Sequence, residues 1–346
     1  MFHRLLLIII LFSLFACGNK PTDQQSNTNS TDSVQTENSL LKVNEALKDD
    51  PNNAELYYER AQIYANQKMI DEALQDIDRA LKLDSLNEDF YLYKGDLYIQ
   101  KGNGTEAEKT YLKATKIKEE SPNGYIKLSE LMYYGGYYED MLKYANEALK
   151  RDMYNDRAYF NKGYAFLKMG DTTNAISSFQ TAVEQNNELY DAYIILGYLM
   201  QAENNPLAED YFKNALRVKP EDYQAKYNLA YYYQETGQYN KAIELYNELH
   251  EKFPKQVNPL FNLGFIHLMY LHVYDIAMDY FNKVLEIEPN NYKALFNRGY
   301  CKELTGDIEG AEQDYKKVLE INPVYTPAAL ALERFDRKEY HIEPKN

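Results

Sequence analysis

Aromatic and asparagine side chains recur at a fixed interval from residue 161 onward in this 346-residue chain. The aromatic residues succeed one another at intervals of 33 to 35 residues, and in four of five cases an asparagine stands three positions earlier. The set comprises Asn161, Tyr164, Tyr198, Asn228, Tyr231, Asn262, Phe265, Asn297 and Tyr300. An aromatic ring offers a large contact area with few rotamers to freeze, and a carboxamide both donates and accepts hydrogen bonds. This chemistry suits the binding of an extended peptide or a sugar.

Residues that could make or break bonds are scarce by comparison. Apart from His3, the only histidines are His250, His267, His272 and His341. His267 and His272 are five residues apart, whereas a metal-binding pair on one helical face is separated by three or four. The zinc-protease motif, the phosphate-binding glycine loop and the nucleophile elbow are all absent from the sequence. We therefore expect no catalytic residue, no metal site and no cofactor, and predict that the protein is not an enzyme.

The spacing of the binding candidates belongs to a longer internal repeat. Small residues recur every 33 to 35 positions, at Ala61, Gly95, Ser129, Gly163, Gly197, Ala230, Gly264 and Gly299. A second register stands 11 to 13 positions after the first, at Ala73, Ala107, Met141, Ala175, Ala208, Ala242, Ala277 and Ala311. Such a period indicates that one supersecondary unit has been repeated along the chain.

Each repeated unit has the pattern of two amphipathic helices. Apolar spacings of three and four, as in Leu56, Tyr57, Ala61 and Tyr64, are helical. Glycine-containing turns come after the first helices, and prolines stop the second helices at Pro220, Pro254, Pro289 and Pro323. We expect the small residues to lie where the paired helices cross closely, since a bulky side chain there would force the backbones apart.

These features closely resemble the tetratricopeptide repeat family. The unit at 223–256 carries the family pattern in Asn228, Leu229, Ala230, Tyr233, Ala242, Tyr246 and Pro254. We place repeats one to eight at 54–87, 88–121, 122–155, 156–189, 190–222, 223–256, 257–291 and 292–325. The resemblance implies an all-α fold, a right-handed superhelical solenoid of tandem helix-turn-helix repeats. We expect an N-terminal capping helix within 40–53 and a C-terminal capping helix and tail over 326–346.

In this family the first helices line a concave groove, and the residue after the small position points into it. The resemblance therefore implies an acidic half of the groove at Gln62, Asp96 and Glu130, and an aromatic half at the tyrosines and Phe265 named above. The four asparagines resemble the asparagine ladder of peptide-binding members. An alternative is that asparagine is simply common at that family position, and both interpretations remain open.

Three repeats depart from the pattern. Repeat three has Met141 and the pair Gly135 and Gly136, repeat five loses a residue near Pro206, and repeat seven gains one near His272. We interpret these departures as changes in local twist. A hinge or a partner-specific loop is the alternative.

The N-terminus predicts export and a lipid anchor. Residues 1–16 have Arg4 and then an apolar run, which is too short to span a bilayer and is typical of a signal peptide. The residues that end at Cys17 resemble a bacterial lipobox, which implies cleavage before Cys17 and lipid attachment to its thiol. Residues 17–39 are almost wholly polar and predict a flexible tether. The other cysteine, Cys301, is expected to be buried without a disulfide.

The charge balance restricts the partners. The formal net charge is −15, and removal of Arg4 with the signal peptide makes it about −16. An acidic surface repels the phosphate groups of nucleic acids and anionic lipids. We expect no nucleic-acid binding, and membrane contact only through the lipid on Cys17.

We therefore predict a lipoprotein of the bacterial cell envelope, anchored in the outer membrane and facing either the periplasm or the cell exterior. Its predicted function is that of an adaptor or scaffold that binds other envelope proteins or extended peptides in its groove. The alternatives are a carbohydrate- or cell-wall-binding lipoprotein and an auxiliary subunit of an envelope enzyme. The sequence leaves the identity of the partner and the oligomeric state open.

Overall fold

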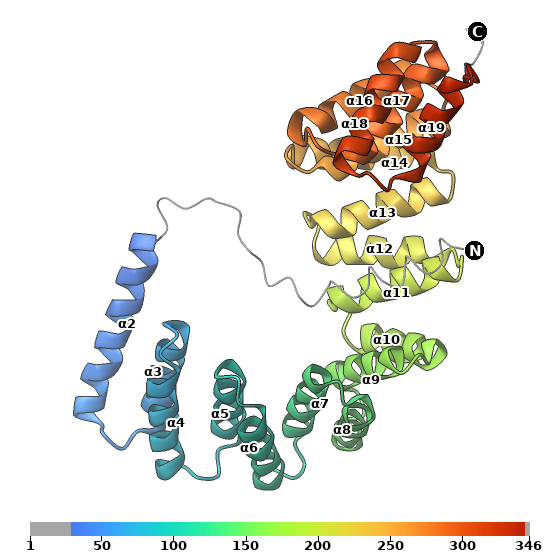
Figure 1. Cartoon of the computed structure of the whole chain (residues 1–346). Helices are drawn as coiled ribbons and strands as arrows, with labels where there is room; N and C mark the ends of the chain where they lie inside the picture. The colour runs from blue at the N-terminus through green and yellow to red at the C-terminus, as the bar shows by residue number, and fades with distance from the viewer. Residues whose placement is uncertain (1–28, 343–346) are drawn as a thin grey trace. The chain divides into compact units, whose positions relative to one another are not determined.

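The computed structural model describes residues 29–342, with side chains described from residue 38 onward. Every regular element in that range is an α-helix, from α2 to α19, and it contains no strand (Figure 1). The chain divides into two compact units, Met1–Ala192 (unit 1) and Tyr193–Asn346 (unit 2). The predicted all-α class is confirmed. The predicted signal peptide, Cys17 and the first part of the tether lie outside the described residues.

Unit 1 contains one leading helix and then a series of helix pairs. Its helices are α2 (Asn29–Asp49), α3 (Ala54–Asn66), α4 (Ile70–Leu83), α5 (Glu88–Gln100), α6 (Gly104–Ile117), α7 (Asn123–Gly135), α8 (Tyr138–Arg151), α9 (Asp156–Lys168) and α10 (Thr172–Gln185). The pairs α3 and α4, α5 and α6, α7 and α8, and α9 and α10 fall on repeats one to four.

Unit 2 continues the same pattern. Its helices are α11 (Tyr190–Ala202), which begins just before the boundary, α12 (Leu207–Val218), α13 (Tyr223–Glu235), α14 (Tyr239–Lys252), α15 (Val257–Met269), α16 (Tyr274–Ile287), α17 (Tyr292–Thr305), α18 (Ile308–Ile321) and α19 (Thr326–Asp336). In both units the first helix of each pair begins within one residue of the repeat start that the sequence predicts.

Local sequence explains where the helices begin and end. The side chains of Asn53, Asn155, Asp222 and Asn291 accept hydrogen bonds from backbone N–H groups in the first turn of the helices that they precede. The four prolines predicted as stops each stand two residues after the end of a second helix. Between the two helices of each repeat, one residue adopts a positive φ. These residues are Lys68, Gly102, Gly136, Gly170, Asn204, Gly237, His272 and Gly306.

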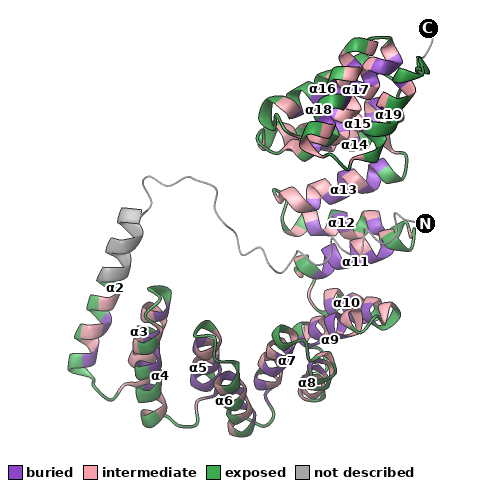
Figure 2. Cartoon of the chain, viewed as in Figure 1, coloured by how far each residue is buried: buried purple, intermediate pink, exposed green. Residues whose placement is uncertain are grey.

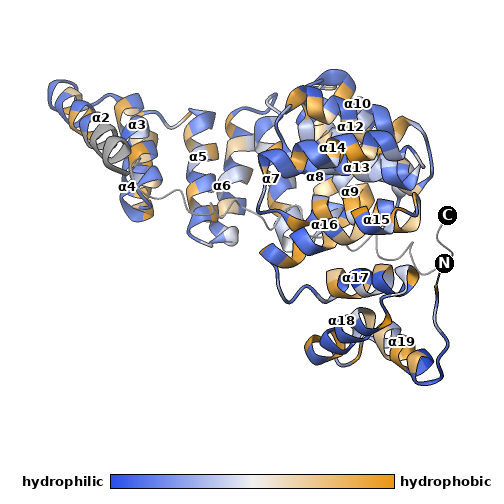
Figure 3. Cartoon of the chain, turned by 90° about the horizontal axis from the view of Figure 1, so that it is seen from above, coloured by the Kyte–Doolittle hydropathy of each residue, from blue (hydrophilic) through white to orange (hydrophobic). Residues whose placement is uncertain are grey.

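Apolar and polar residues are interspersed along the described helices (Figure 3). The apolar residues form the buried core, which runs through successive helices of each unit (Figure 2). All eight alanine or methionine residues of the second register are at most 2% exposed. The second register therefore lies in the buried face of each second helix.

The small residues of the first register are opposed by one side chain from the second helix of the same repeat. A Cβ atom added to Gly163 would lie 2.8 Å from Cδ1 of Phe179, and one added to Gly264 would lie 2.9 Å from Cε1 of Phe281. We call the small residues the small position and the opposing residues the ring position. The ring position is occupied by Ile77, Tyr111, Ala145, Phe179, Phe212, Tyr246, Phe281 and Tyr315. The five glycines among the small residues thus make room for a buried ring, whereas the sequence predicts that the small residues admit a neighbouring backbone.

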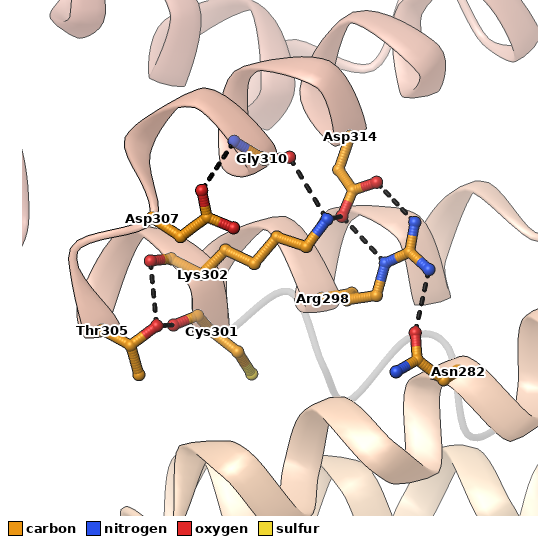
Figure 4. A network of polar contacts seen from close by, with 8 residues as sticks. All are labelled: Asn282, Arg298, Cys301, Lys302, Thr305, Asp307, Gly310 and Asp314. Atoms are coloured by element: carbon orange, nitrogen blue, oxygen red, sulfur yellow. Dashed lines mark hydrogen bonds and ion pairs between the residues drawn. The ribbon is translucent and has the colours of Figure 1, made fainter.

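A charged cluster ties helices together in repeat eight (Figure 4). The guanidinium of Arg298 donates to Oδ2 of Asp314 from Nε at 2.9 Å and to Oδ1 of Asn282 from Nη1 at 2.9 Å. The ammonium of Lys302 lies 2.8 Å from Oδ2 of Asp314. The carboxylate of Asp314 is buried, so these two cations neutralise it where water cannot.

The same arrangement recurs at the start of the described chain. Arg60 pairs with the buried Asp76 at 2.7 Å and donates from Nη1 to Oδ1 of Asn44 at 2.8 Å. Asn44 lies on α2 and precedes Arg60 by 16 residues, as Asn282 on α16 precedes Arg298. Towards repeat one, α2 therefore takes the place that a second helix takes in the rest of the array.

The N-terminal capping helix is longer than the sequence predicts. It begins at Asn29, whereas the sequence predicts a capping helix within 40–53 and a tether over residues 17–39. In the sequence, residues 29–39 are polar except for Val34, so they give no amphipathic signal. A helix that is already held by the buried Val43 and Leu47 extends at little cost, because each added residue gains a hydrogen bond without a new nucleation step.

At the other end, α19 and the tail close the array around one buried carboxylate. Glu303 is 0% exposed and accepts hydrogen bonds from Arg334 Nη1 at 2.7 Å, Tyr315 Oη at 2.9 Å and the backbone N–H of His341 at 2.8 Å. Phe335 of α19 packs against the ring of Tyr315. No helix within residues 29–342 is long and apolar enough to cross a membrane.

Filling the small position should destabilise the protein. In Gly163→Ala the new methyl group meets the ring of Phe179, which is fully buried and cannot move aside, so we expect a loss of about 1–3 kcal/mol. The measurement is the shift of the urea or thermal midpoint. Gly104→Ala is the matched control, because its Cβ would find its nearest neighbour, Cδ1 of Leu131, at 3.9 Å. Equal midpoints for the two variants would contradict the packing argument.

Candidate partner-binding face

The candidate binding residues of unit 2 lie on the first helices of repeats five to eight. We call Tyr198, Asn228, Tyr231, Asn262, Phe265, Asn297 and Tyr300 the partner face. Two of them are in direct contact, since Tyr198 Oη on α11 donates to Asn228 Oδ1 on α13 at 2.8 Å. In unit 1, Asp96 on α5 and Lys127 on α7 stand at the corresponding places and are also in contact. In both cases, therefore, the residue that follows the small position contacts the residue that stands two places before the small position of the next repeat.

The side-chain amide of Asn228 lies in an unusual environment. The residue is 4% exposed, and its Oδ1 accepts from both Tyr198 Oη and Gln224 Nε2, the latter at 2.7 Å. Its Nδ2 is buried and has no hydrogen-bond partner among the described residues. A buried donor without an acceptor costs roughly 1–3 kcal/mol, and most folded proteins avoid it.

Asn262 is different, because both of its donors are used inside the protein. Its Nδ2 donates to Tyr227 Oη and to Tyr246 Oη, each at 2.9 Å. The ring of Tyr246 occupies the ring position of repeat six, and its hydroxyl donates onward to Gln234 at 3.2 Å. Asn262 therefore supports the core from the partner face, and its carboxamide has no free donor for a ligand.

The two candidates in unit 1 are more deeply placed than the sequence predicts. Asn161 is 5% exposed, and its Nδ2 is buried without a partner among the described residues, as in Asn228. Tyr164 is buried, with its ring edge-on to those of Phe160 and Phe179 at centroid distances of 5.2 and 5.7 Å. Tyr164 thus contributes to the core of repeat four.

The remaining aromatic residues of the partner face are half-buried. The ring of Phe265 lies edge-on to Tyr270, which stacks on Tyr239 at a centroid distance of 4.5 Å. Burial raises the pKa of Tyr198 and of Tyr231 to about 12. Both hydroxyls are therefore protonated at neutral pH, and that of Tyr198 already donates to Asn228. Asn297 and Tyr300 on α17 are also half-buried.

The predicted acidic half of the groove is largely neutralised. Asp96 accepts from Lys127 Nζ at 2.9 Å and from the hydroxyl of Tyr111 at 2.7 Å. Glu130 on α7 pairs with Arg157 on α9 at 2.7 Å. These pairs bridge successive repeats, so the two carboxylates stabilise neighbouring helices and present little net charge to a basic partner.

The described residues offer little for metal binding or covalent chemistry. No group of three or more histidine, cysteine, aspartate or glutamate side chains within 29–342 is placed to hold a metal ion. His267 Nδ1 lies 2.8 Å from the carbonyl oxygen of Leu263, and His272 contacts Tyr274. Burial raises the pKa of the Cys301 thiol to about 12, so it stays protonated and unreactive at neutral pH.

Sequence reasoning missed one group of exposed aromatic residues. Tyr134 and Tyr137 flank Gly135 and Gly136 at the end of α7 and project into solvent. The signal was present in the sequence as the glycine pair of repeat three. An interpretation of that pair as a change in local twist leaves out the space that a glycine offers to a neighbouring side chain.

Comparison with known proteins identifies the repeats. Sequence models of the tetratricopeptide repeat match residues 70–124 and 198–257, residues 54–85 and 292–325, and residues 156–188. Together these segments cover more than half of the chain.

Among curated proteins, the chain is similar to segments of much longer ones. It is 28% identical over 180 residues to BBSome complex member BBS4 of Bos taurus, covering 50% of this chain and 33% of that protein. It is 26% identical over 238 residues to a TPR repeat-containing protein of Methanocaldococcus jannaschii, covering 63% of this chain and 35% of that protein. A UDP-N-acetylglucosamine–peptide N-acetylglucosaminyltransferase of Giardia intestinalis is 26% identical over 179 residues, which are 51% of this chain and 12% of that enzyme. The chain thus spans about a third or less of the length of these relatives.

Solved structures of repeat proteins are also similar to this chain. PilW, described as a type IV pilus biogenesis factor, superimposes with a TM-score of 0.50 at 21% identity, over 59% of this chain and 94% of PilW, and shares the fold. The C-terminal part of a TPR repeat-containing protein from Cytophaga hutchinsonii gives a TM-score of 0.49 at 19% identity, over 65% and 93% of the two chains.

The different environments of the asparagines lead to a stability prediction. Asn262→Ala removes the donor that serves two buried tyrosine hydroxyls, so we expect a loss of roughly 1–3 kcal/mol. Asn297→Ala is the matched control, because Asn297 is half-buried and has no hydrogen bond to a described residue. Thermal or urea midpoints of the two variants check this. A larger loss for Asn297→Ala would contradict the assignment of Asn262 to the core.

Proposed function

Because the chain belongs to the tetratricopeptide repeat family, we propose that it is a binding protein that holds an extended segment of a partner protein along the partner face. We further propose that a lipid on Cys17 anchors it in the outer membrane of a bacterial cell envelope, where it serves as an adaptor or scaffold and not as an enzyme.

The observation that carries the binding proposal is the unpartnered amide of Asn228. Its Nδ2 is a buried donor that the protein leaves without an acceptor among the described residues, beside the hydroxyl of Tyr198. Once the side chains that cover Nδ2 move aside, a backbone carbonyl of a bound peptide can be such an acceptor, and every residue of an extended peptide provides one. The half-buried rings of Tyr231 and Phe265 would add apolar contact with few rotamers to freeze.

The relatives and the N-terminal sequence support a scaffolding role. One relative is by its name a member of a multi-protein complex, the BBSome. The similarity to a transferase covers only 12% of that enzyme, so its activity is not part of the proposal. A lipid anchor would confine the partner face to the membrane surface and raise its effective concentration towards other envelope proteins.

The partner face can be tested in intact cells with a photo-crosslinking amino acid at Glu235, which is exposed and one helical turn after Tyr231. We expect a defined protein to be captured there. Asn228→Asp should reduce capture about tenfold, because the carboxylate keeps the acceptor for Tyr198 and Gln224 but lacks the donor for a peptide carbonyl.

A crosslinker at Tyr154, an exposed residue between α8 and α9, is the control for non-specific capture. Capture of the same proteins from Tyr154, or capture from Glu235 that Asn228→Asp leaves unchanged, would show that the partner does not use this face.

The anchor is tested separately by Cys17→Ala. We expect the variant to move from the membrane fraction to the soluble fraction and to lose incorporation of an alkyne-labelled fatty acid, because the thiol that carries the lipid is gone. Continued sedimentation of Cys17→Ala with the membranes would show that another attachment exists. That result would leave the crosslinking test of the partner face unaffected.

A further inference from the structure

Repeat three departs from the other repeats at the turn between its helices. Gly136 supplies the positive φ that the turn of every repeat requires, here 74°. Gly135, the last residue of α7, is not required by the backbone, since the other repeats place non-glycine residues there. A Cβ atom on Gly135 would lie 2.6 Å from Cδ2 and Cε2 of Tyr137. Gly135 is therefore needed by the ring of Tyr137.

That ring contributes little to the stability of the fold. Tyr137 is 61% exposed and Tyr134 is 73% exposed. At the place of Tyr137, repeats two, four and eight have Asn103, Asp171 and Asp307, whose side chains cap the second helix. Tyr137 makes no side-chain cap on α8. Repeat three thus lacks the helix cap of repeats two, four and eight and a helix-favouring residue at 135, and has an exposed aromatic ring at 137.

The two tyrosines border a cavity of about 580 Å³ that is formed by α5, α6 and α7 within unit 1. Ile99, Leu131 and Met132 supply its apolar lining, and Thr105 and Glu108 on α6 supply polar groups. The remaining lining consists of Gly102, Gly104 and Gly135, which bring backbone to the surface of the cavity. No lysine, arginine or histidine is among these described lining residues. None of them belongs to the partner face.

We propose that this cavity binds a neutral oligosaccharide, with a sugar ring stacked on Tyr137. A pyranose ring has C–H groups on its faces and hydroxyls around its edge. Its face would pack against an exposed aromatic ring while a hydroxyl donates to the acceptor-only carboxylate of Glu108. An N-acetyl group would place its methyl on the apolar lining. The absence of a cation among the lining residues disfavours an acidic ligand.

Aromatic pockets also bind proline-rich peptides, and Glu108 argues against this second class. Proline has no backbone N–H, so a proline-rich segment has fewer donors for the Glu108 carboxylate than a sugar has. A sugar has several hydroxyl donors in reach of one position. The chemistry of the lining therefore favours the saccharide.

The chain contains no tryptophan, so Tyr137→Trp creates a single fluorescent reporter that keeps a stacking ring in the cavity. We expect chitotriose, a linear trisaccharide of N-acetylglucosamine, or maltotriose to quench it saturably, with a Kd in the millimolar range or tighter. Tyr154→Trp is the matched control, because Tyr154 is 66% exposed and does not line the cavity. Calorimetry on the wild-type protein checks that the tryptophan does not itself create the site.

Gly135→Ala separates a binding role from a structural one. The added methyl group occupies the space of the exposed Tyr137 ring, which can swing into solvent, while alanine favours the helix. We expect a melting temperature equal to or above that of the parent and binding about tenfold weaker or lost.

Three results would overturn the proposal: no saturable binding to wild-type protein, equal quenching in Tyr154→Trp, or full binding in Gly135→Ala. Tyrosine-dependent binding of a proline-rich peptide in place of the sugars would also overturn it.

Discussion

The array depends on one packing contact within a repeat. A side chain of the second helix fills the space that a small residue of the first helix leaves. In five repeats a glycine of the first helix lies under an aromatic ring of the second helix, and these rings are at most 2% exposed. A ring there buries much apolar surface, but it fits only while the opposite residue stays small. Because each repeat must meet this condition separately, the small residues recur with the period of the fold. The period of the small residues in the sequence therefore follows from one packing constraint.

The same rings connect the core to the polar side chains of the first helices. The hydroxyls of Tyr111, Tyr246 and Tyr315 donate to Asp96, Gln234 and Glu303 respectively. Burial raises the pKa of each of these tyrosines well above its ordinary value, so each remains a neutral donor. The acceptor side chains are consequently fixed in position by the core. A side chain on the first helix can therefore be structural even when its place in the repeat is one that binds partners in this family.

The surface of the first helices can thus serve either the core or a partner. This is why only part of the structure could be predicted from the sequence. The helix pairs and their starts were predictable from the period, since the small position and the proline stops act locally. The neutralisation of Asp96 and Glu130 was not, because Lys127 and Arg157 stand in other repeats and meet these carboxylates only after stacking. Asn262 and Asn228 look alike in sequence, yet only Asn262 has tyrosine hydroxyls that accept from its Nδ2, whereas Asn228 meets a tyrosine hydroxyl at its Oδ1. The start of α2 was missed because its first residues carry no apolar face.

Repeat three illustrates the effect of relaxing the packing constraint. Its small position is Ser129, and its ring position holds only Ala145, so no aromatic ring fills that space. Ser129 Oγ donates instead to the backbone carbonyl of Met141 at 2.9 Å, which joins the two helices through a hydrogen bond. Two aromatic residues of this repeat, Tyr134 and Tyr137, stand exposed at its turn. A repeat that does not need its rings for the core can present them to a ligand, and the glycine at 135 keeps one of them in place.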